Sequence, residues 1–583
     1  TQKDPTISID GKTALLGDKV YYRVNIDASR LTDTAYKVWR LGMTDDYDQE
    51  YLTLDAKHVE ILDETGRDRT GEFNIQDKDG VLYAFAKTVD TQIPATGETV
   101  PGDPQPGDLK AYSEKTDKDY DPLKDPSIDQ SLLGHTYQVV MPMTVTKVKD
   151  GHTVENTATQ VTNDKRDKTN TVTNPLKEIN PTKDVTVKVG GDSIDGKSVY
   201  LNHTFLYRLD SSILPPDRAY QTVTDWGGTD QLNTEYDQYL GNWAVYASRD
   251  LYRDGQMLAA KGEKIAGSGF DSSKFGGNLF TVDADDNGKV TADATQAYLD
   301  LVSADNEHEA GWVLYLQCKR IAVADEVPNT WTETINGQPR ESNKVVTKTP
   351  DMTPSIHLEK VDTPTLKQEG QEQADRDDPK QALKMDADSI GITFIITNTS
   401  KTDPATGDGA WYKASDLNLA DSTIVGDAHV DMDSLTYPAD WDTLVLKPGE
   451  SVSVTGTLKG VKEGETHTDR AIVTGTPLVE CAPSNGDPFN DKTDGGEDTD
   501  PEYSTGDVTE IDGKQLCADT QTASNTDDWN GYRAKPLAST GTAVLGLAGG
   551  ALAVLLAGGS LLVFRKRHYA QGSGRHTAVN AGK

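Results

Sequence analysis

An internal repeat places the strongest constraint on how this 583-residue chain can fold. The motif Ser-Ile-Asp-Gly-Lys at positions 8–12 recurs at positions 193–197. Each copy is followed, at the same spacing, by an apolar segment that contains a Tyr-Arg pair, at positions 20–24 and 205–209. Self-similarity at a fixed offset indicates homologous modules arranged in series. The repeat therefore predicts at least two related domains.

Short segments rich in Val, Thr and Tyr predict the secondary structure of these modules. Residues 137–148 and 312–323 are of this kind, and turn-forming residues bound them. Residues 292–303 carry apolar side chains at helical spacing, which predicts one short helix covering a sheet. A hydrophobic content of 35%, with 51 glycines and 26 prolines, suits small β domains. We predict an all-β fold of tandem immunoglobulin-like β-sandwich modules.

Joints that contain proline divide the expected modules. Residues 174–181 and 347–350 form such joints, and proline makes short joints stiff. Strand-like residues 391–396 and 451–458 predict a third module, followed by an acidic tract too polar to pack. The expected divisions are residues 1–178, 179–352 and 353–482 for the three modules and residues 483–536 for an acidic linker.

The balance of charges excludes several classes of partner. The chain has 94 Asp and Glu residues against 58 Lys and Arg residues, a formal net charge of −36 at pH 7. This charge repels the phosphates of nucleic acids and of anionic bilayers, so nucleic-acid binding is excluded. Three cysteines cannot build a disulfide framework, but Cys481 and Cys517 can pair in an oxidising compartment. Cys318 is expected to be a buried apolar residue.

The C-terminal segment predicts the location of the chain. Residues 542–564 are uncharged and apolar, and a transmembrane helix needs about 20 such residues. The basic residues that follow place the tail, residues 565–583, in the cytoplasm and everything before the helix outside the cell. The five residues before the helix are Leu537, Ala538, Ser539, Thr540 and Gly541.

This pentapeptide resembles the sorting motif of Gram-positive surface proteins, with Ala538 in place of the usual proline. The resemblance implies that a sortase cleaves between Thr540 and Gly541 and joins the chain to a peptidoglycan precursor. The membrane helix is then only a transient anchor. The alternative is a permanent single-pass anchor without processing.

Four motifs in a fixed order carry a second resemblance. They are Asn180-Pro-Thr-Lys-Asp-Val, Ser193-Ile-Asp-Gly-Lys, Lys319-Arg-Ile-Ala-Val and Ser342-Asn-Lys-Val. Residues 1–352 are similar, through these motifs, to the C-terminal stalk modules of streptococcal antigen I/II adhesins. The resemblance implies a non-enzymatic stalk with its ligand-binding head upstream. Because no initiating methionine is present, we expect the sequence to begin inside a longer chain or after processing.

The family resemblance also implies an intramolecular amide bond in each module. Such modules join a lysine on the first strand to an asparagine near the module's end, with an aspartate assisting. The matching residues are Lys3, Asp45 and Asn156 in the first module and Lys183, Asp225 and Asn329 in the second, and the two aspartates follow their lysines at equal spacing. The reaction needs burial, because an apolar core favours the neutral amine and the protonated acid.

Other residues compete for these roles. Asp46 neighbours Asp45, and Asn170 and Asn343 follow the favoured asparagines of their modules, again at equal spacing. In the third module Lys360 lies on an expected first strand, and Asn525 is the weak candidate for its partner. The contrasting interpretation is that all these residues are ordinary surface lysines and turn asparagines.

No other motif indicates catalysis, and no cofactor is required. Residues 283–288 resemble the start of an EF-hand calcium loop, but Ala294 stands where a bidentate glutamate is expected. Calcium binding is possible there or elsewhere, and a solvated β-turn is the alternative. The segment from His467 to Asp469 has no partner serine or cysteine in a nucleophile elbow.

Three functions remain open. The first is the structural stalk of a wall-anchored adhesin in a Gram-positive bacterium. In the second, these modules themselves bind host glycoproteins or other bacteria. In the third, the chain is the stalk of a surface hydrolase whose catalytic domain lies upstream.

Overall fold

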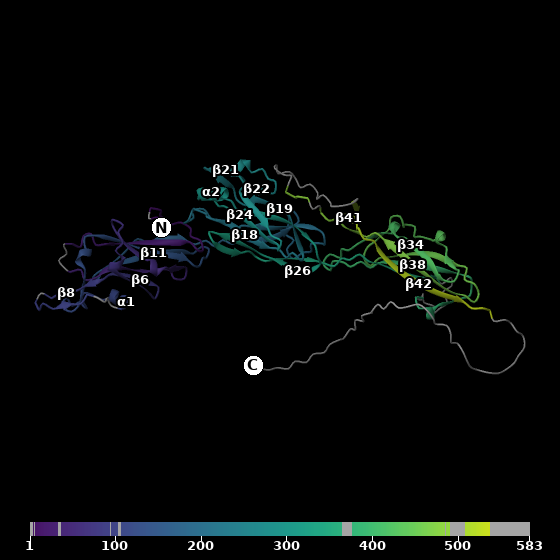
Figure 1. Ribbon diagram of the computed structural model, residues 1–583, viewed down its shortest axis with the longest axis horizontal. Coiled ribbons are helices and arrows are strands. Elements are labelled where there is room, and N and C mark those ends of the chain that lie inside the picture. The colour runs from purple at the N-terminus through teal and green to yellow at the C-terminus, as the bar shows by residue number, and fades with distance from the viewer. Residues whose placement is uncertain are drawn as a thin grey trace, which may run out of the picture.

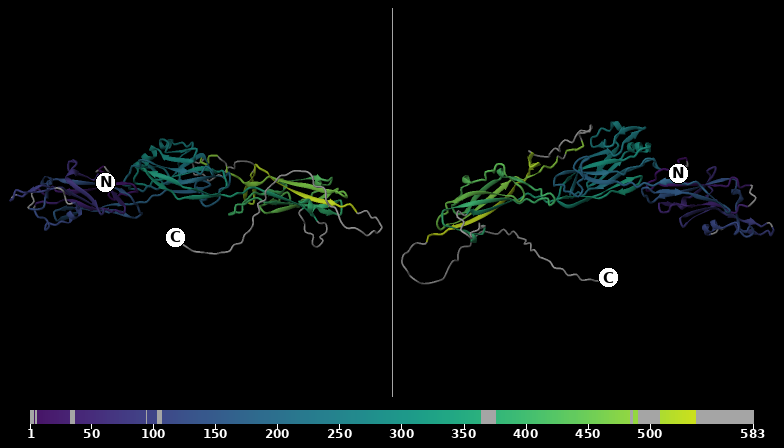
Figure 2. Two further views of the ribbon diagram at one scale, coloured as in Figure 1. Left: turned by 60° about the horizontal axis from the view of Figure 1, so that its bottom comes forward. Right: turned by 180° about the vertical axis from the view of Figure 1, so that it is seen from behind.

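The computed structural model describes residues 4, 6–32, 37–93, 95–102, 107–363, 376–483, 486–489 and 508–536. Its regular secondary structure is mostly β-strand with few short helices, so the prediction of an all-β fold is confirmed. Three β bodies follow one another in a row (Figure 1), and two further views show the same row (Figure 2). We call these bodies the first, second and third modules.

The first module carries β1–β15. Its strands are β1 Lys19–Asp27, β2 Leu41–Asp46, β3 Leu52–Leu54, β4 Glu60–Asp63, β5 Phe73–Lys78, β6 Val81–Ala86, β7 Thr88–Val89, β8 Thr91–Gln92, β9 Thr99–Val100, β10 Ser127–Ile128, β11 Thr136–Val145, β12 Thr153–Asn156, β13 Ala158–Thr162, β14 Lys165–Lys168 and β15 Val172–Pro175. Its helices are α1 Leu109–Glu114 and the 3₁₀ turns Ala56–His58, Thr70–Glu72 and Gln130–Leu132. Two main sheets, β1-β11-β3 with β4 and β14-β13-β2-β6-β5, enclose the core.

The second module carries β16–β29. Its strands are β16 Thr182–Thr186, β17 Thr204–Asp210, β18 Trp226–Gln231, β19 Asp237–Ala247, β20 Leu251–Arg253, β21 Gln256–Ala259, β22 Lys264–Gly267, β23 Phe280–Ala284, β24 Lys289–Ala294, β25 Trp312–Arg320, β26 Ala324–Asn329, β27 Trp331–Ile335, β28 Gln338–Glu341 and β29 Val345–Thr349. Its helices are α2 Gln296–Ala304 and the 3₁₀ turn Ser273–Phe275. Sheets β16-β17-β25-β19-β22 and β23-β24-β18-β27-β28 pack around a core that includes Trp226, Trp312 and Trp331.

The third module carries β30–β42. Its strands are β30 Ile356–Thr363, β31 Leu383–Met385, β32 Ser389–Asn398, β33 Tyr412–Lys413, β34 Asn418–Val425, β35 His429–Val430, β36 Val445–Leu446, β37 Ser451–Lys459, β38 Thr466–Gly475, β39 Leu478–Glu480, β40 Thr509–Ile511, β41 Lys514–Ala518 and β42 Ala523–Arg533. Its 3₁₀ turns are Pro379–Gln381, Ala414–Asp416 and Met432–Ser434. Sheets β30-β32-β37-β35 and β31-β42-β38-β34 enclose the core.

Two local expectations differ from the structure. The helix expected over residues 292–303 begins only at Gln296, because the preceding residues pair with β18 and β23 as part of β24. The acidic linker expected over residues 483–536 contains three strands of the third module. Its last strand, β42, pairs with β38 from Thr466–Tyr532 to Gly475–Ala523 and buries Trp529 completely. The burial of this ring explains why a polar segment becomes part of the fold.

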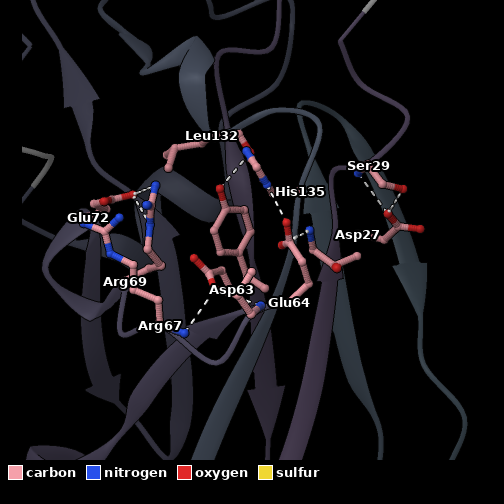
Figure 3. A network of polar contacts seen from close by, with 12 residues as sticks. Asp27, Ser29, Asp63, Glu64, Arg67, Arg69, Glu72, Leu132 and His135 are labelled. Atoms are coloured by element: carbon pink, nitrogen blue, oxygen red, sulfur yellow. Dashed lines mark hydrogen bonds and ion pairs between the residues drawn. The ribbon is translucent and has the colours of Figure 1, made fainter.

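Polar contacts stabilise the turn that follows β4 in the first module (Figure 3). Asp63 Oδ1 accepts hydrogen bonds from the backbone N–H groups of Thr65 and Arg67, both at 3.0 Å. The neighbouring Glu64 lies 2.7 Å from His135 Nδ1, which comes directly before β11. Since β4 pairs with β11, these contacts close the loop at the end where the two strands meet. They are exposed, so each contributes little to stability.

The C-terminal predictions lie outside the described residues. These are the sorting motif of residues 537–541, the membrane helix of residues 542–564 and the tail of residues 565–583. Within the described ranges, no helix has the length and apolar character that crossing a membrane requires.

Candidate cross-linking sites

The first module places Asp45 and Asn156 side by side in its core. Asp45 is the fifth residue of β2, and the alternation of that strand turns its side chain inward. In the antiparallel register Asp45 pairs with Ala158, and Asn156 lies two residues before Ala158. Asn156 Nδ2 donates to Asp45 Oδ2 at 3.0 Å. Both residues are buried, at 0% and 4% exposure.

This buried pair is incompletely satisfied. Asp45 Oδ1 and Asn156 Oδ1 have no hydrogen-bond partner among the residues that the structure describes. Burial raises the pKa of Asp45 from 3.8 to about 6, and the hydrogen bond from Asn156 only partly opposes this effect. A buried carboxyl that retains its proton can donate to an amide oxygen. The pair therefore has the chemistry that an assisted amide transfer requires.

The competing residues of the first module lie elsewhere. Asp46 and Asn170 are both exposed, so they lack the burial that the reaction needs. Lys3 lies outside the described residues.

In the second module, Lys183 lies in the core with an aspartate beside it. The side chains of Lys183 and Asp230 are 0% and 1% exposed, and Lys183 Nζ donates a hydrogen bond to Asp230 Oδ2. The ammonium also lies 4.5 Å from the centre of the Tyr207 ring. Burial lowers the pKa of Lys183, although the charge of Asp230 opposes the shift. This environment favours the neutral amine, which is the nucleophilic form.

The aspartate predicted at this site, Asp225, is not the one that Lys183 contacts. Asp225 precedes β18 and is partly exposed, and its Oδ1 accepts from the backbone N–H of Gly337 at 3.1 Å. Asp230, further along the chain, is the fifth residue of β18 and faces the core. Strand register, rather than distance from the lysine along the chain, decides which side chain points inward, and it brings Asp230 and not Asp225 into contact with Lys183.

The sequence around Asp230 matches the sequence around Asp45. Asp45 ends the segment Gly42-Met-Thr-Asp45, and Asp230 ends Gly227-Gly-Thr-Asp230. The offset between the two aspartates equals the offset that relates Ser8 to Ser193. The distance from the lysine does not reveal the match between Asp45 and Asp230, because the stretch between Lys183 and Ser193 is longer than that between Lys3 and Ser8.

The two modules also share the position of the asparagine. Asp230 pairs in register with Trp331, and Asn329 lies two residues before Trp331, as Asn156 lies two residues before Ala158. The Trp331 indole donates to the carbonyl of Thr182, next to Lys183, at 3.0 Å. Asn329 is 6% exposed, and its Nδ2, like Asp230 Oδ1, has no hydrogen-bond partner within the described ranges.

Asn343, the competing asparagine of the second module, binds the backbone of Lys183. Its Oδ1 accepts from the backbone N–H of Lys183 at 2.8 Å, and its Nδ2 donates to the Lys183 carbonyl at 2.9 Å. These two hydrogen bonds hold β16, the strand that carries Lys183, against the segment that contains Asn343. Asn525 behaves similarly in the third module, where its Oδ1 accepts from the backbone N–H of Leu358 at 3.0 Å.

The structure also places the three cysteines and the calcium-like segment. Cys481 and Cys517 form a disulfide between the end of β39 and β41, and Cys318 is free and buried. The calcium-like segment is the turn between β23 and β24, where Asp285 Oδ1 accepts from the backbone N–H groups of Asn287 and Lys289, both at 2.9 Å. Across the described part of the chain, no group of three or more His, Cys, Asp or Glu side chains is arranged to bind a metal ion.

Comparisons with known proteins identify two matching families. Residues 1–176 match the family model of the cell surface antigen I/II C2 terminal domain, and residues 180–350 match that of the cell surface antigen C-terminus. Both families consist of surface antigens, which agrees with the prediction of a non-enzymatic protein on the surface of a Gram-positive cell. The aggregation substance of Enterococcus faecalis is 30% identical over 324 residues. That match covers 55% of this chain, and the chain spans 21% of the length of this relative.

Two solved structures are also similar. The C-terminal domain of the Streptococcus pyogenes antigen I/II-family protein AspA is 22% identical, with a TM-score of 0.44 over 58% of this chain and 95% of that one. The C-terminal domain of the Streptococcus agalactiae antigen I/II polypeptide BspA is 19% identical, with a TM-score of 0.43 over 59% of this chain and 97% of that one.

Proposed function

Since residues 1–350 belong, as two successive domains, to the antigen I/II family of cell-surface antigens, we propose that the chain is the covalently cross-linked stalk of a surface adhesin. Each of its first two modules closes one amide bond, Lys3 to Asn156 and Lys183 to Asn329. The assisting acids are Asp45 and Asp230. The observation that carries the proposal is the buried contact between Lys183 and Asp230, with the incompletely satisfied Asn329 two residues before Trp331, the register partner of Asp230.

The reaction follows from the side chains that meet in the core. Lys183 transfers a proton to Asp230, which leaves a neutral amine and a neutral acid in an apolar environment. Protonated Asp230 donates to the Asn329 amide oxygen and makes the carbon more electrophilic. The amine attacks that carbon, the carbon–nitrogen bond of the side-chain amide breaks, and ammonia leaves. Each module performs the reaction once, so it is a maturation step and no turnover follows.

The proposed cross-link changes how the second module responds to tension. β16 begins the second module and β26 lies near its end, so the bond joins distant parts of the sequence through side chains. Extension of the chain between Lys183 and Asn329 then requires breaking a covalent bond. A stalk under shear benefits from such a bond, because hydrogen bonds between strands rupture one after another under tension.

The test is peptide mass mapping of the purified full chain. We expect two branched peptides, one joining the regions of Lys3 and Asn156 and the other those of Lys183 and Asn329, each lighter than its linear components by one ammonia. The variants Asp45→Ala and Asp230→Ala should each lose the branched peptide of their own module.

Asp225→Ala is the matched control, because it removes a nearby carboxyl that does not contact Lys183. It should retain both branched peptides. Linear, unmodified peptides from both modules in the parent chain would refute the cross-links. Loss of the second bond in Asp225→Ala, but not in Asp230→Ala, would refute the assignment of the acid.

Anchoring to the cell wall completes the proposal. The order of sorting motif, apolar segment and basic tail in residues 537–583 supports cleavage by a sortase between Thr540 and Gly541. The new carboxyl group of Thr540 is then joined to a peptidoglycan precursor. The stalk is thereby covalently continuous from its first module to the wall.

A further inference from the structure

The third module contains a buried lysine held between two carboxylates. Lys360, on β30, has a side chain that is 0% exposed. Its Nζ lies 2.5 Å from Asp421 Oδ2 and 2.6 Å from Asp469 Oδ2, and these side chains are 2% and 0% exposed. This cluster lies in the part of the chain that neither family match covers.

The fold brings the three side chains together from both sheets. Asp421 on β34 pairs in register with Ala471, and Asp469 lies two residues before Ala471 on β38. Positions two residues apart on a strand face the same side, so both carboxyls point from one sheet toward β30 of the other. The Phe394 ring centre lies 5.5 Å from Lys360 Nζ and excludes water on the remaining side.

The charges of this cluster do not balance. One ammonium faces two carboxylates, and a buried excess charge is costly. Burial, opposed by the charge of Lys360 and reinforced by that of Asp469, raises the pKa of Asp421 from 3.8 to about 6. Buried His467 also borders this cluster, with its Nε2 3.1 Å from Asp469 Oδ2.

We propose that the third module closes its own cross-link, an amide between Lys360 Nζ and the Asp421 carboxyl carbon. Lys360 gives one proton to Asp421, which becomes a neutral acid, and the amine attacks the acid carbon. A second amine proton passes through Asp469 to the departing hydroxyl. The carbon–oxygen bond breaks and one water molecule leaves. The ammonium and two carboxylates become one amide and one carboxylate, so the net charge is unchanged.

The contacts assign the two acids to different roles. Asp421 Oδ2 accepts the hydrogen bond from Lys360 Nζ, which places this carboxyl in line with the amine. Asp469 Oδ2 lies 2.6 Å from the same amine, and neither Asp469 oxygen accepts a hydrogen bond within the described part of the chain, so this carboxylate can take up the second amine proton. The nearby amide and acid on β42 bind the backbone of β30 instead: Asn525 accepts from Leu358 N, and Asp527 Oδ2 accepts from Lys360 N at 2.5 Å.

This inference is independent of the proposed function. It concerns different residues, and its leaving group is water, whereas the first two modules release ammonia. The two kinds of bond can therefore be established or refuted separately in one mass measurement.

The experiment is high-resolution peptide mapping of the full chain. The expected result is a branched peptide that joins Lys360 to Asp421 and lacks one water. Two linear peptides with free Lys360 and Asp421 would overturn the proposal and leave a buried ion pair. A branch from Lys360 to Asp469 or Asp527 would overturn the assignment of the acceptor.

An isosteric variant provides the sharper test. Asp421→Asn keeps the shape of the acceptor but changes its leaving group, so the branched peptide should now lack one ammonia instead of one water. If Asp421 were not the acceptor, the mass lost on bond formation would not change. Asp469→Asn should slow formation of the bond at least tenfold and leave water as the leaving group.

Lys360→Arg should abolish the bond, because a guanidinium is not a nucleophile at neutral pH. Its matched control is Lys459→Arg, which alters an exposed ion pair with Asp431 and should retain the cross-link. A branched peptide in Lys360→Arg would refute the proposal. If Lys360→Arg does not fold, the change of leaving group in Asp421→Asn decides the question.

Discussion

At the scale of residues, the buried polar atoms of the first module that lack hydrogen-bond partners are the main support for a cross-link there. A single hydrogen bond joins Asp45 and Asn156, and Asp45 Oδ1 and Asn156 Oδ1 are buried without a hydrogen-bond partner among the described residues. Such atoms are costly unless a further donor reaches them, and a lysine amine would be one.

Removal of Lys3 should make the stability of the first module depend on pH. The folded state raises the pKa of Asp45 from 3.8 to about 6, so in this interval the folded state binds a proton that the unfolded state releases. The free energy of unfolding of Lys3→Ala should therefore be largest at the acidic end and decrease as pH rises through about 6. Pulse proteolysis in urea, read at peptides from β2, measures this dependence. The double variant with Asp45→Asn lacks the titration, and identical profiles for the two variants would contradict the prediction.

At the scale of elements, glycine allows the strand that carries the acid to lie close to its neighbour. A Cβ atom on Gly42 of β2 would lie 2.3 Å from the carbonyl oxygen of Ala84, and one on Gly227 of β18 would lie 2.5 Å from that of Ala292. Neither distance is sterically allowed. The two glycines occupy equivalent positions, three residues before Asp45 and Asp230. The shared Gly-x-Thr-Asp pattern thus combines a packing requirement with a chemical one.

Gly227→Ala should displace β18 and reduce cross-linking in the second module. We expect a destabilisation of about 1–3 kcal/mol, typical of overpacking, and a smaller yield of the branched peptide that joins Lys183 to Asn329. Differential scanning calorimetry and peptide mapping measure the two effects. Gly71→Ala is the control, because a Cβ there would meet nothing within 4 Å. Full cross-linking in Gly227→Ala, with unchanged stability, would show that the close approach is not required.

At the scale of the whole molecule, neighbouring modules contact one another through hydrogen bonds and apolar packing. Between the first and second modules, Thr13 N donates to the Asp217 carbonyl at 2.8 Å, and Ala219 N donates to the Thr13 carbonyl at 2.7 Å. Between the second and third, Phe489 is buried among apolar residues of the second module, and Lys264 Nζ donates to its carbonyl at 2.8 Å. Such contacts limit the relative rotation of neighbouring modules, as the proposed stalk requires.

Sortase processing should make Thr540 the last residue of the mature, wall-linked chain. Wall digestion should release fragments whose last residue of this chain is Thr540, joined to a peptidoglycan peptide. Thr540→Ala should shift the chain from the wall fraction to the membrane fraction, whereas Thr542→Ala, just beyond the motif, should leave it in the wall. Wall fragments that extend past Gly541 would contradict sortase cleavage.

The sequence by itself determined the class of the fold and identified two of the residues that meet in the core. The internal repeat and the Val-, Thr- and Tyr-rich segments predicted tandem β modules, because strand alternation and turn residues are local properties. Lys183 and Asn329 were identified through local motifs, and both are buried in the core. The repeat offset also contained Asp230, although counting from the lysine pointed to Asp225.

Only the tertiary structure decided which groups meet. Asp230 reaches Lys183 because register turns its side chain inward, and register depends on pairing between strands far apart in the sequence. β42 is rich in Asp and Asn, and its sequence alone indicated a linker. It becomes the last strand of its module because β38 satisfies its backbone and the core buries Trp529. The cluster of Lys360, Asp421 and Asp469 arises in the same way, from three strands in two sheets. Long-range pairing determines such neighbours, and a local pattern cannot encode it.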